Sequence, residues 1–203
     1  MIDHEAKWDT LLRIQTTGRD DSNADEYRYP YEPTPYCVLE RLEESGLIRR
    51  DDVVLDYGCG KGRVDFFLAH ETKSRTIGIE YDPHIYQEAL KNAKTAPSHL
   101  RTDFVLTNAE LYDLPPDVNR CYFFNPFSAQ ILQTVLARIL DSYYENPREI
   151  LLFFYYPSDD FVACLMTEDA LDFYDEIFCG DLFDGNDPRE RILIFSLPDL
   201  SEL

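Results

Sequence analysis

The sequence is poor in basic residues. Its 203 residues include 19 lysines and arginines against 39 aspartates and glutamates, which gives a formal net charge of −20. A chain this acidic repels phosphate backbones, so nucleic acid is disfavoured as a partner. The sequence also lacks any apolar run approaching the roughly 18 residues of a membrane span, and it lacks the start typical of a signal peptide. We therefore expect a soluble, cytoplasmic protein without membrane contact.

Paired cysteines and clustered histidines are lacking as well. No CxxC pair occurs, and the five cysteines are scattered, so neither a disulfide framework nor a zinc site is indicated. The four histidines are dispersed, and we predict no bound metal. There is no internal repeat and no long Gly/Ser linker. The 44% hydrophobic and 14% aromatic content is sufficient for one continuous core.

The acidic excess is concentrated in the last quarter of the chain. Residues 151–203 hold 13 acidic and 2 basic side chains, whereas residues 51–100 hold 8 and 6. A solvated face that maintains solubility is the simpler interpretation of this excess. A docking surface for a basic partner is the alternative.

Strand and helix patterns alternate from residue 52 onward. Two further strands are predicted near the end, at 173–178 and 191–197; they leave little room for a helix between them and should pair antiparallel. Five βα steps and this hairpin predict an α/β fold, namely a Rossmann-like, doubly wound, seven-stranded, mostly parallel sheet with a C-terminal antiparallel β-hairpin. The five earlier strands are predicted at residues 53–56, 76–80, 104–106, 121–124 and 149–156.

Residues 1–35 are predicted to form an N-terminal extension to this domain, which would span residues 36–203. Apolar residues at helical spacing predict a short helix within residues 4–15. The segment 27–36 then contains three prolines and four tyrosines, and proline keeps such a segment extended.

A glycine-rich turn is the strongest motif. Gly58, Gly60 and Gly62 follow the first predicted strand directly and precede a helix. Without side chains in the way, the backbone N–H groups of such a turn can face an anionic or zwitterionic ligand. A nicotinamide-binding fingerprint would require glycine at the next position, where this chain has Arg63.

Two acidic residues accompany the turn. Asp56 stands two positions before the first glycine, and Glu80 ends the second predicted strand. A carboxylate at the latter place can accept the hydroxyls of a ribose. A tight turn without ligand would explain the glycines alone, but it would not require both acids.

This combination resembles the class I S-adenosylmethionine-dependent methyltransferases, from about residue 36 to the C-terminus. The resemblance implies S-adenosyl-L-methionine as cofactor, with Gly62 in the same cofactor-binding turn. It implies that Gly58 and Gly60 line the methionine moiety, that Asp56 orients its ammonium end, and that Glu80 holds the ribose.

The resemblance also implies residues for the adenine. Tyr81 would pack on the ring, although an ordinary aromatic residue is an equally good interpretation. Asn108 and Ala109, after the third predicted strand, match the positions that read the adenine edge. The family commonly has aspartate in place of Asn108.

A second motif, Asn125-Pro126-Phe127, ends the fourth predicted strand and should face the same crevice. It resembles the Asn/Asp-Pro-Pro-aromatic motif of amino-group N-methyltransferases, with one proline rather than two. The resemblance implies that the Asn125 side-chain oxygen and the Pro126 carbonyl accept the hydrogens of a target NH₂. Phe127 would pack against a planar or cationic group. An Asn-Pro turn that merely ends the strand is the alternative.

The extended arm is similar in kind to segments that cover the cofactor in enzymes methylating protein side chains. Tyr31, Thr34 and Tyr36 would then face the ligand, or else the arm packs its tyrosines across the sheet edge. We predict a methyltransferase acting on a nitrogen of a protein or small-molecule acceptor, for which a basic acceptor fits the charge. The alternatives are a small-molecule O-methyltransferase and a cofactor-binding partner subunit that has lost catalysis.

Overall fold

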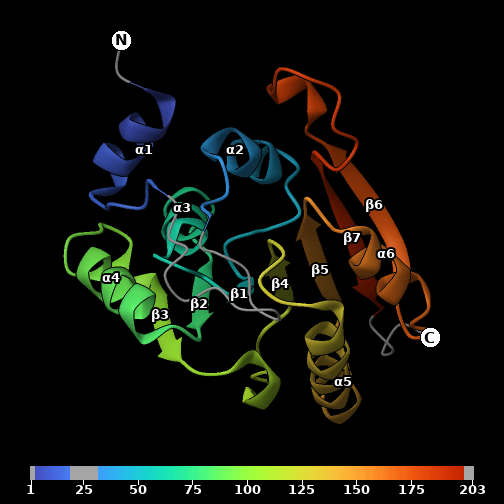
Figure 1. The fold of residues 1–203 in the computed structure, drawn as a ribbon. Coiled ribbons are helices and arrows are strands. Elements are labelled where there is room, and N and C mark those ends of the chain that lie inside the picture. The colour runs from blue at the N-terminus through green and yellow to red at the C-terminus, as the bar shows by residue number, and fades with distance from the viewer. Residues whose placement is uncertain (1–2, 19–31, 199–203) are drawn as a thin grey trace.

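Seven strands form one mixed sheet, shown in Figure 1. This computed structural model describes residues 3–18 and 32–198. The strands are β1 (Val53–Tyr57), β2 (Arg75–Glu80), β3 (Thr102–Leu106), β4 (Arg120–Phe123), β5 (Ile150–Tyr155), β6 (Asp172–Phe178) and β7 (Arg191–Leu197). Their order is β3-β2-β1-β4-β5-β7-β6, with β7 antiparallel to both of its neighbours and the first five strands parallel. The predicted fold class is confirmed.

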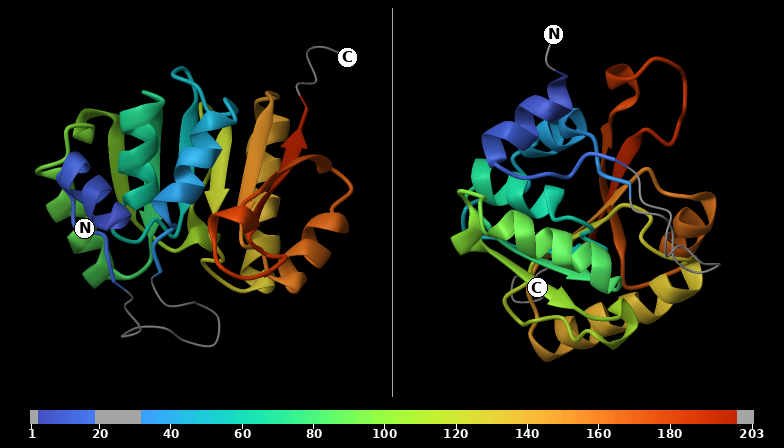
Figure 2. Two further views of the ribbon diagram at one scale, coloured as in Figure 1. Left: turned by 90° about the horizontal axis from the view of Figure 1, so that it is seen from above. Right: turned by 60° about the vertical axis from the view of Figure 1, so that its left-hand side comes forward.

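Helices cover both faces of the sheet (Figure 2). They are α1 (His4–Leu12), α2 (Tyr36–Glu44), α3 (Arg63–Glu71), α4 (Pro83–Ala93), α5 (Ala129–Glu145) and α6 (Asp159–Met166), with 3₁₀ turns η1 (His99–Arg101), η2 (Ala109–Leu111) and η3 (Gly180–Leu182). Among the described residues, no helix has the length and apolar character needed to cross a bilayer.

Two apolar cores lie on opposite faces of the sheet. Along β5, Leu152 and Phe154 point into the core shared with α5 and α6, while Leu151 and Phe153 point into the core shared with α1, α2 and α3. Because successive side chains of a strand alternate between faces, a strand covered on both sides must be apolar throughout. This explains the continuous apolar run seen in the sequence.

The crevice for a ligand lies between β1 and β4, which are neighbours with Tyr57 beside Phe123. The chain leaves β1 for α3 on one face and leaves β4 for α5 on the other. Such a switch in direction opens a gap at the carboxyl ends of parallel strands. The glycine turn and the Asn-Pro-Phe motif therefore emerge side by side.

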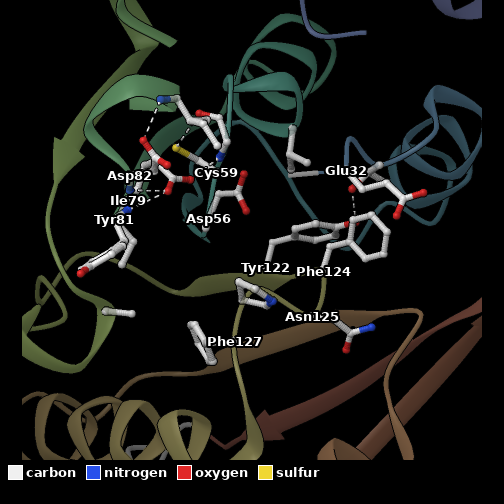
Figure 3. A pocket seen from close by; sticks show the side chains of 18 of the residues that line it. Glu32, Asp56, Cys59, Ile79, Tyr81, Asp82, Tyr122, Phe124, Asn125 and Phe127 are labelled. Atoms are coloured by element: carbon white, nitrogen blue, oxygen red, sulfur yellow. Dashed lines mark hydrogen bonds between the residues drawn. The ribbon is translucent and has the colours of Figure 1, made fainter. Parts of the chain in front are cut away.

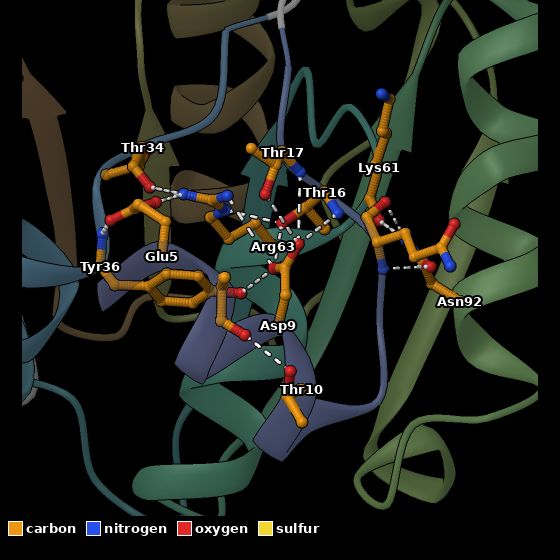
Figure 4. A network of polar contacts seen from close by, with 12 residues as sticks. Glu5, Asp9, Thr10, Thr16, Thr17, Thr34, Tyr36, Lys61, Arg63 and Asn92 are labelled. Atoms are coloured by element: carbon orange, nitrogen blue, oxygen red, sulfur yellow. Dashed lines mark hydrogen bonds and ion pairs between the residues drawn. The ribbon is translucent and has the colours of Figure 1, made fainter. Parts of the chain in front are cut away.

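The start of the chain is tied to α3 by a buried arginine (Figure 4). Arg63 is 2% exposed. Its Nε donates to Thr16 Oγ1 at 2.8 Å, its Nη1 donates to the Thr34 carbonyl at 3.1 Å, and the same group forms an ion pair with Glu5. The described part of the predicted extension thus packs into the domain core. Residues 19–31, which include Tyr31 and most of the predicted arm, lie outside the described residues.

Two details differ from the sequence interpretation. The third βα step contains only η2, because Asn108 caps a single turn and the prolines at Pro115 and Pro116 follow it. The additional helix α6 begins after Ser158, whose hydroxyl accepts from the Phe161 N–H at 3.2 Å. Its Ser-Asp-Asp start is a capping signal in the sequence, but eight residues give too short an apolar pattern to stand out.

Candidate active site

A cavity opens at the carboxyl ends of β1, β2 and β4, and Figure 3 shows its lining. We call it the first cavity. Of the eleven site residues predicted from the sequence, ten line it: Asp56, Gly58, Gly60, Glu80, Tyr81, Asn108, Ala109, Asn125, Pro126 and Phe127. The two predicted motifs are therefore parts of one site.

The glycine turn is shaped for close approach of backbone and side chains. Gly58 has φ of +76°, and a Cβ there would lie 2.5 Å from Pro126 Cβ. Glycine at this position therefore lets the second motif pack directly on the turn. Gly62 does not line the cavity; it has φ of +83° and a Cβ there would lie 2.6 Å from the Phe104 ring. Its contribution is to the shape of the turn before α3.

Glu80 fixes the turn through backbone hydrogen bonds. Its carboxylate accepts from the N–H groups of Gly60 at 3.0 Å, Tyr81 at 2.8 Å and Asp82 at 2.8 Å. Burial raises the pKa of Glu80, and these hydrogen bonds oppose the rise. A carboxylate has about four acceptor positions, so roughly one remains for a ligand hydroxyl while the turn keeps this form.

Two buried carboxyls lie behind the turn. Asp56 lines the cavity, and Asp65 sits beside it on the first turn of α3. Asp56 Oδ2 and both carboxyl oxygens of Asp65 have no hydrogen-bond partner among the described residues. Burial raises the pKa of Asp56 to about 7, and burial together with the neighbouring Asp56 raises the pKa of Asp65. Two buried carboxyls this close favour a state in which the pair holds a proton.

Arg63 also lines the first cavity. The sequence pattern predicts no role for Arg63 at the site and shows only that it replaces a glycine of the nicotinamide-binding fingerprint. Its Nη2 has no hydrogen-bond partner among the described residues and approaches Asp9 Oδ1 only to 3.9 Å. A buried guanidinium with an open donor is suited to an anionic ligand group.

The three residues predicted to contact the adenine, Asn108, Tyr81 and Ala109, differ in their hydrogen bonds and in their exposure. Asn108 caps η2, with its Oδ1 accepting from the Glu110 N–H at 3.1 Å and its Nδ2 donating to Glu110 Oε2 at 3.2 Å. One acceptor position of its amide oxygen remains. Tyr81 is 53% exposed and stands at the rim of the cavity, while Ala109 is buried in its wall.

Asn125 connects the end of β4 to the turn after β5. Its Nδ2 donates to the Tyr156 carbonyl and its Oδ1 accepts from the Ser158 N–H at 3.3 Å. In Figure 3 the amide points away from Asp56. Both ends of the amide are thus engaged, and one acceptor position on the oxygen remains for another donor.

Phe127 is mostly a core residue. It is 5% exposed and packs edge-on against Tyr57 and Phe123, with both centroid distances 6.4 Å. The aromatic side chain more open to a ligand is Phe124, which is half-buried. The sequence pattern predicts Phe124 as part of the strand and gives it no role at the site, because the family motif places its aromatic residue after the proline.

A second cavity adjoins the first. The two share Glu32, Pro33, Phe124 and Asn125 in their linings. Residues from the end of β5 and from the β6–β7 connection complete the second cavity. In residues 3–18 and 32–198 no group of three or more His, Cys, Asp or Glu side chains is placed to hold a metal ion.

Comparison with known proteins agrees with this geometry. Residues 54–144 match the family model of a methyltransferase domain. The match runs from β1 into α5 and so contains the glycine turn, Glu80 and Asn125.

One curated relative matches a shorter stretch. It is a protein-lysine N-methyltransferase of Saccharolobus islandicus (strain REY15A), 38% identical over 64 residues, which is 31% of this chain. The match spans 40% of that relative's length.

Solved structures share the fold over most of the chain. An RNA methyltransferase from Salinibacter ruber, in complex with S-adenosyl-L-homocysteine, has a TM-score of 0.59 at 19% identity and covers 83% of this chain and 95% of its own. A putative tRNA (m1A22) methyltransferase from Streptococcus pneumoniae has a TM-score of 0.58 at 17% identity, with 79% and 71% covered. At these identities the likeness concerns the fold.

The sheet order, the glycine turn and the acid at the end of β2 define a Rossmann-like protein that binds a nucleoside-containing cofactor. Among such cofactor-binding proteins, the match to the methyltransferase-domain model identifies a methyltransferase. This match and the fold identify residues 54–144 as a domain of the class I S-adenosylmethionine-dependent methyltransferases, whose cofactor is S-adenosyl-L-methionine.

Proposed function

We propose that this methyltransferase acts on a nitrogen, the amino group of a protein or small-molecule acceptor. The observation that carries the proposal is the position of Asn125, which lines both the first and the second cavity, with Pro126 beside it in the wall of the first. The similarity of residues in this chain to a protein-lysine N-methyltransferase supports the same acceptor atom.

The residues of the first cavity fit the cofactor. The cavity beside the glycine turn and the open donor of Arg63 are the features that favour a ligand with an anionic group at this place. Arg63 Nη2 would hold the carboxylate of the methionine moiety, and Asp56 would face its ammonium group. The remaining acceptor position of Glu80 would take a ribose hydroxyl.

When bound, S-adenosylmethionine would supply a methyl group on a positively charged sulfur. The lone pair of a neutral amine would form the new N–C bond while the S–C electron pair stays on sulfur, and the resulting ammonium would lose its proton to solvent. Such a displacement depends on alignment more than on acid–base catalysis. Asn125 Oδ1 and the Pro126 carbonyl would align the acceptor by accepting its N–H hydrogens. The amide is held in place because its Nδ2 donates to the Tyr156 carbonyl and its Oδ1 accepts from the Ser158 N–H.

The test is the chemical identity of the methylated product. The protein is incubated with S-adenosylmethionine labelled in its methyl group and a cell extract, and the protein, RNA and small-molecule fractions are separated. We expect label on nitrogen in the protein or amine fraction, stable to acid hydrolysis. Label only in RNA or on oxygen contradicts the proposal.

A variant at the junction sharpens this test. Asn125→Ala should abolish turnover and leave the affinity for S-adenosylhomocysteine intact, because its oxygen faces the acceptor side. The matched control is Asn146→Ala, the residue that ends α5 far from the cavity. Unchanged turnover in Asn125→Ala favours the alternative in which the Asn-Pro turn is only structural.

A further inference from the structure

The second cavity is walled by aromatic rings. Phe124, Tyr155, Tyr156 and Phe183 line it. The Phe124 and Tyr155 centroids are 4.8 Å apart at an interplanar angle of 49°, and those of Tyr155 and Tyr156 are 6.1 Å apart. Tilted rings around a space present their electron-rich faces and edges to a guest, and the faces attract cations.

Carboxylates complete the wall. Glu190 and Glu32 line the cavity, and no described lining residue is basic. Tyr155 Oη donates to Glu190 Oε2 at 2.8 Å, so the ring and the carboxylate hold each other in place. Burial raises the pKa of the Tyr155 hydroxyl, and its hydrogen bond to Glu190 adds to the rise, so the phenol stays protonated as the donor.

One cation already occupies an aromatic face beside this cavity. The Arg189 guanidinium lies 4.4 Å from the centroid of the Tyr156 ring. Arg189 pairs with Asp187 at 2.9 Å, and Tyr156 Oη donates to the same carboxylate at 2.6 Å. The local arrangement of ring plus carboxylate thus binds a cation within the protein itself.

We propose that the second cavity is the acceptor site and that it takes the alkylammonium side chain of a lysine in a basic segment of a protein. This inference rests on the proposed function, because an amine held here would lie next to Phe124 and Asn125 at the mouth of the first cavity. The rings and the two carboxylates recognise the charged head, and the apolar walls accommodate its methylene stem. Before transfer the ammonium gives up one proton to solvent, because only the neutral amine has the lone pair that forms the N–C bond.

The surroundings of the cavity favour a protein rather than a free amine. The two segments that supply Ser158, Phe183 and Glu190, residues 156–160 and 180–191, carry six acidic and two basic side chains. Both basic side chains, Arg189 and Arg191, form ion pairs. A basic stretch around the target lysine complements this rim, whereas a small amine has nothing to contact there.

Equilibrium binding tests the proposal without turnover. The full chain, saturated with S-adenosylhomocysteine, is titrated with a fluorescent peptide holding one lysine among arginines and with the same peptide carrying norleucine instead. We expect the lysine peptide to bind about tenfold or more tightly than the norleucine peptide, and n-butylamine to bind far more weakly than either. Equal affinity of the two peptides overturns the lysine site, and n-butylamine matching the peptide overturns the protein acceptor.

Variants locate the binding. Glu190→Gln and Phe124→Leu should each lower the affinity for the lysine peptide about threefold to thirtyfold. This is the range that a cation–π or charge contact contributes between exposed and desolvated sites. The control is Asp172→Asn on β6, which pairs with Ser196 at the opposite end of the sheet from the cavity. Affinity for S-adenosylhomocysteine reports that each variant is folded.

The outcomes separate this inference from the proposed function. If both site variants bind the lysine peptide as the original chain does, the cavity assignment is wrong even where methyl transfer to amines persists. If peptide binding follows the expected pattern while label never reaches nitrogen, the proposed function fails and the binding site stands.

Discussion

The two sides of the site are built in different ways. On the β1–β2 side, the geometry is set by the backbone, through the glycine turn and the three N–H groups that Glu80 accepts. On the β4–β5 side, it is set by side chains from separate loops, such as Phe124, Tyr156 and Glu190. A cofactor common to many enzymes can be held by a fixed backbone form, whereas an acceptor requires side chains particular to one protein.

The largest effect is expected from Glu80→Ala. The change removes the acceptor for three backbone N–H groups and the proposed ribose contact, and a hydrogen bond to a charged group contributes roughly 1.5–3 kcal/mol. Calorimetry should show S-adenosylhomocysteine binding at least about tenfold weaker. Glu88→Ala, on the exposed side of α4, is the control. Equal affinity in Glu80→Ala would contradict a backbone-built cofactor side.

The contact between the two sides is tested by Gly58→Ala. The new Cβ meets Pro126 and the residue keeps a positive φ, so we expect a loss of roughly 1–3 kcal/mol in the free energy of unfolding. Gly46→Ala is matched to it, since Gly46 also has a positive φ of +68° but open space around it. The difference between the two variants isolates the contact with Pro126. If they unfold alike, the turn and the second motif do not constrain each other.

The fold and the cofactor side could be predicted from the sequence, because both depend on local patterns. Strand runs, the glycines and the strand-end Glu80 each have a signature of a few residues. Phe124, Tyr155 and Glu190 belong to three separate segments and have no common pattern, so only the folded sheet brings them together. The role of Arg63 could not be predicted, because its burial depends on contacts with α1, which is distant in the sequence.

A pH effect should be confined to the cofactor side. The pKa of Asp56 is raised to about 7 in the folded protein, above the ordinary value near 3.9. The folded state therefore holds its proton more tightly, and stability should fall as pH rises from about 4 to about 7, by up to about 1.4 kcal/mol per pH unit. Denaturant titrations of the original chain and of Asp65→Asn test this. The variant should show a flatter profile, and identical profiles would contradict the shared proton.

Cofactor affinity should have the opposite pH dependence. An ionised Asp56 attracts the ammonium group of the ligand, so S-adenosylhomocysteine should bind more weakly as pH falls below about 7. Calorimetry between about pH 5 and 8 measures the change. A constant affinity over this range would remove Asp56 from the ligand contact.

The smallest effect concerns the acidic rim on the acceptor side. If residues 151–203 attract a basic substrate, its Michaelis constant should rise with salt, because exposed charges are screened over about 8 Å at physiological ionic strength. The affinity for S-adenosylhomocysteine, held by buried contacts, should change much less. A flat response of the Michaelis constant leaves solubility as the explanation of the acidity.

The central claim is tested most directly by locating the transferred methyl group. The protein is incubated with labelled S-adenosylmethionine and the arginine-flanked lysine peptide, and the product is hydrolysed and examined by mass spectrometry. We predict label on the lysine side-chain nitrogen for the original chain and for Asp172→Asn, and no label for Asn125→Ala. Label on oxygen, or none on the lysine while S-adenosylhomocysteine binds normally, would contradict it.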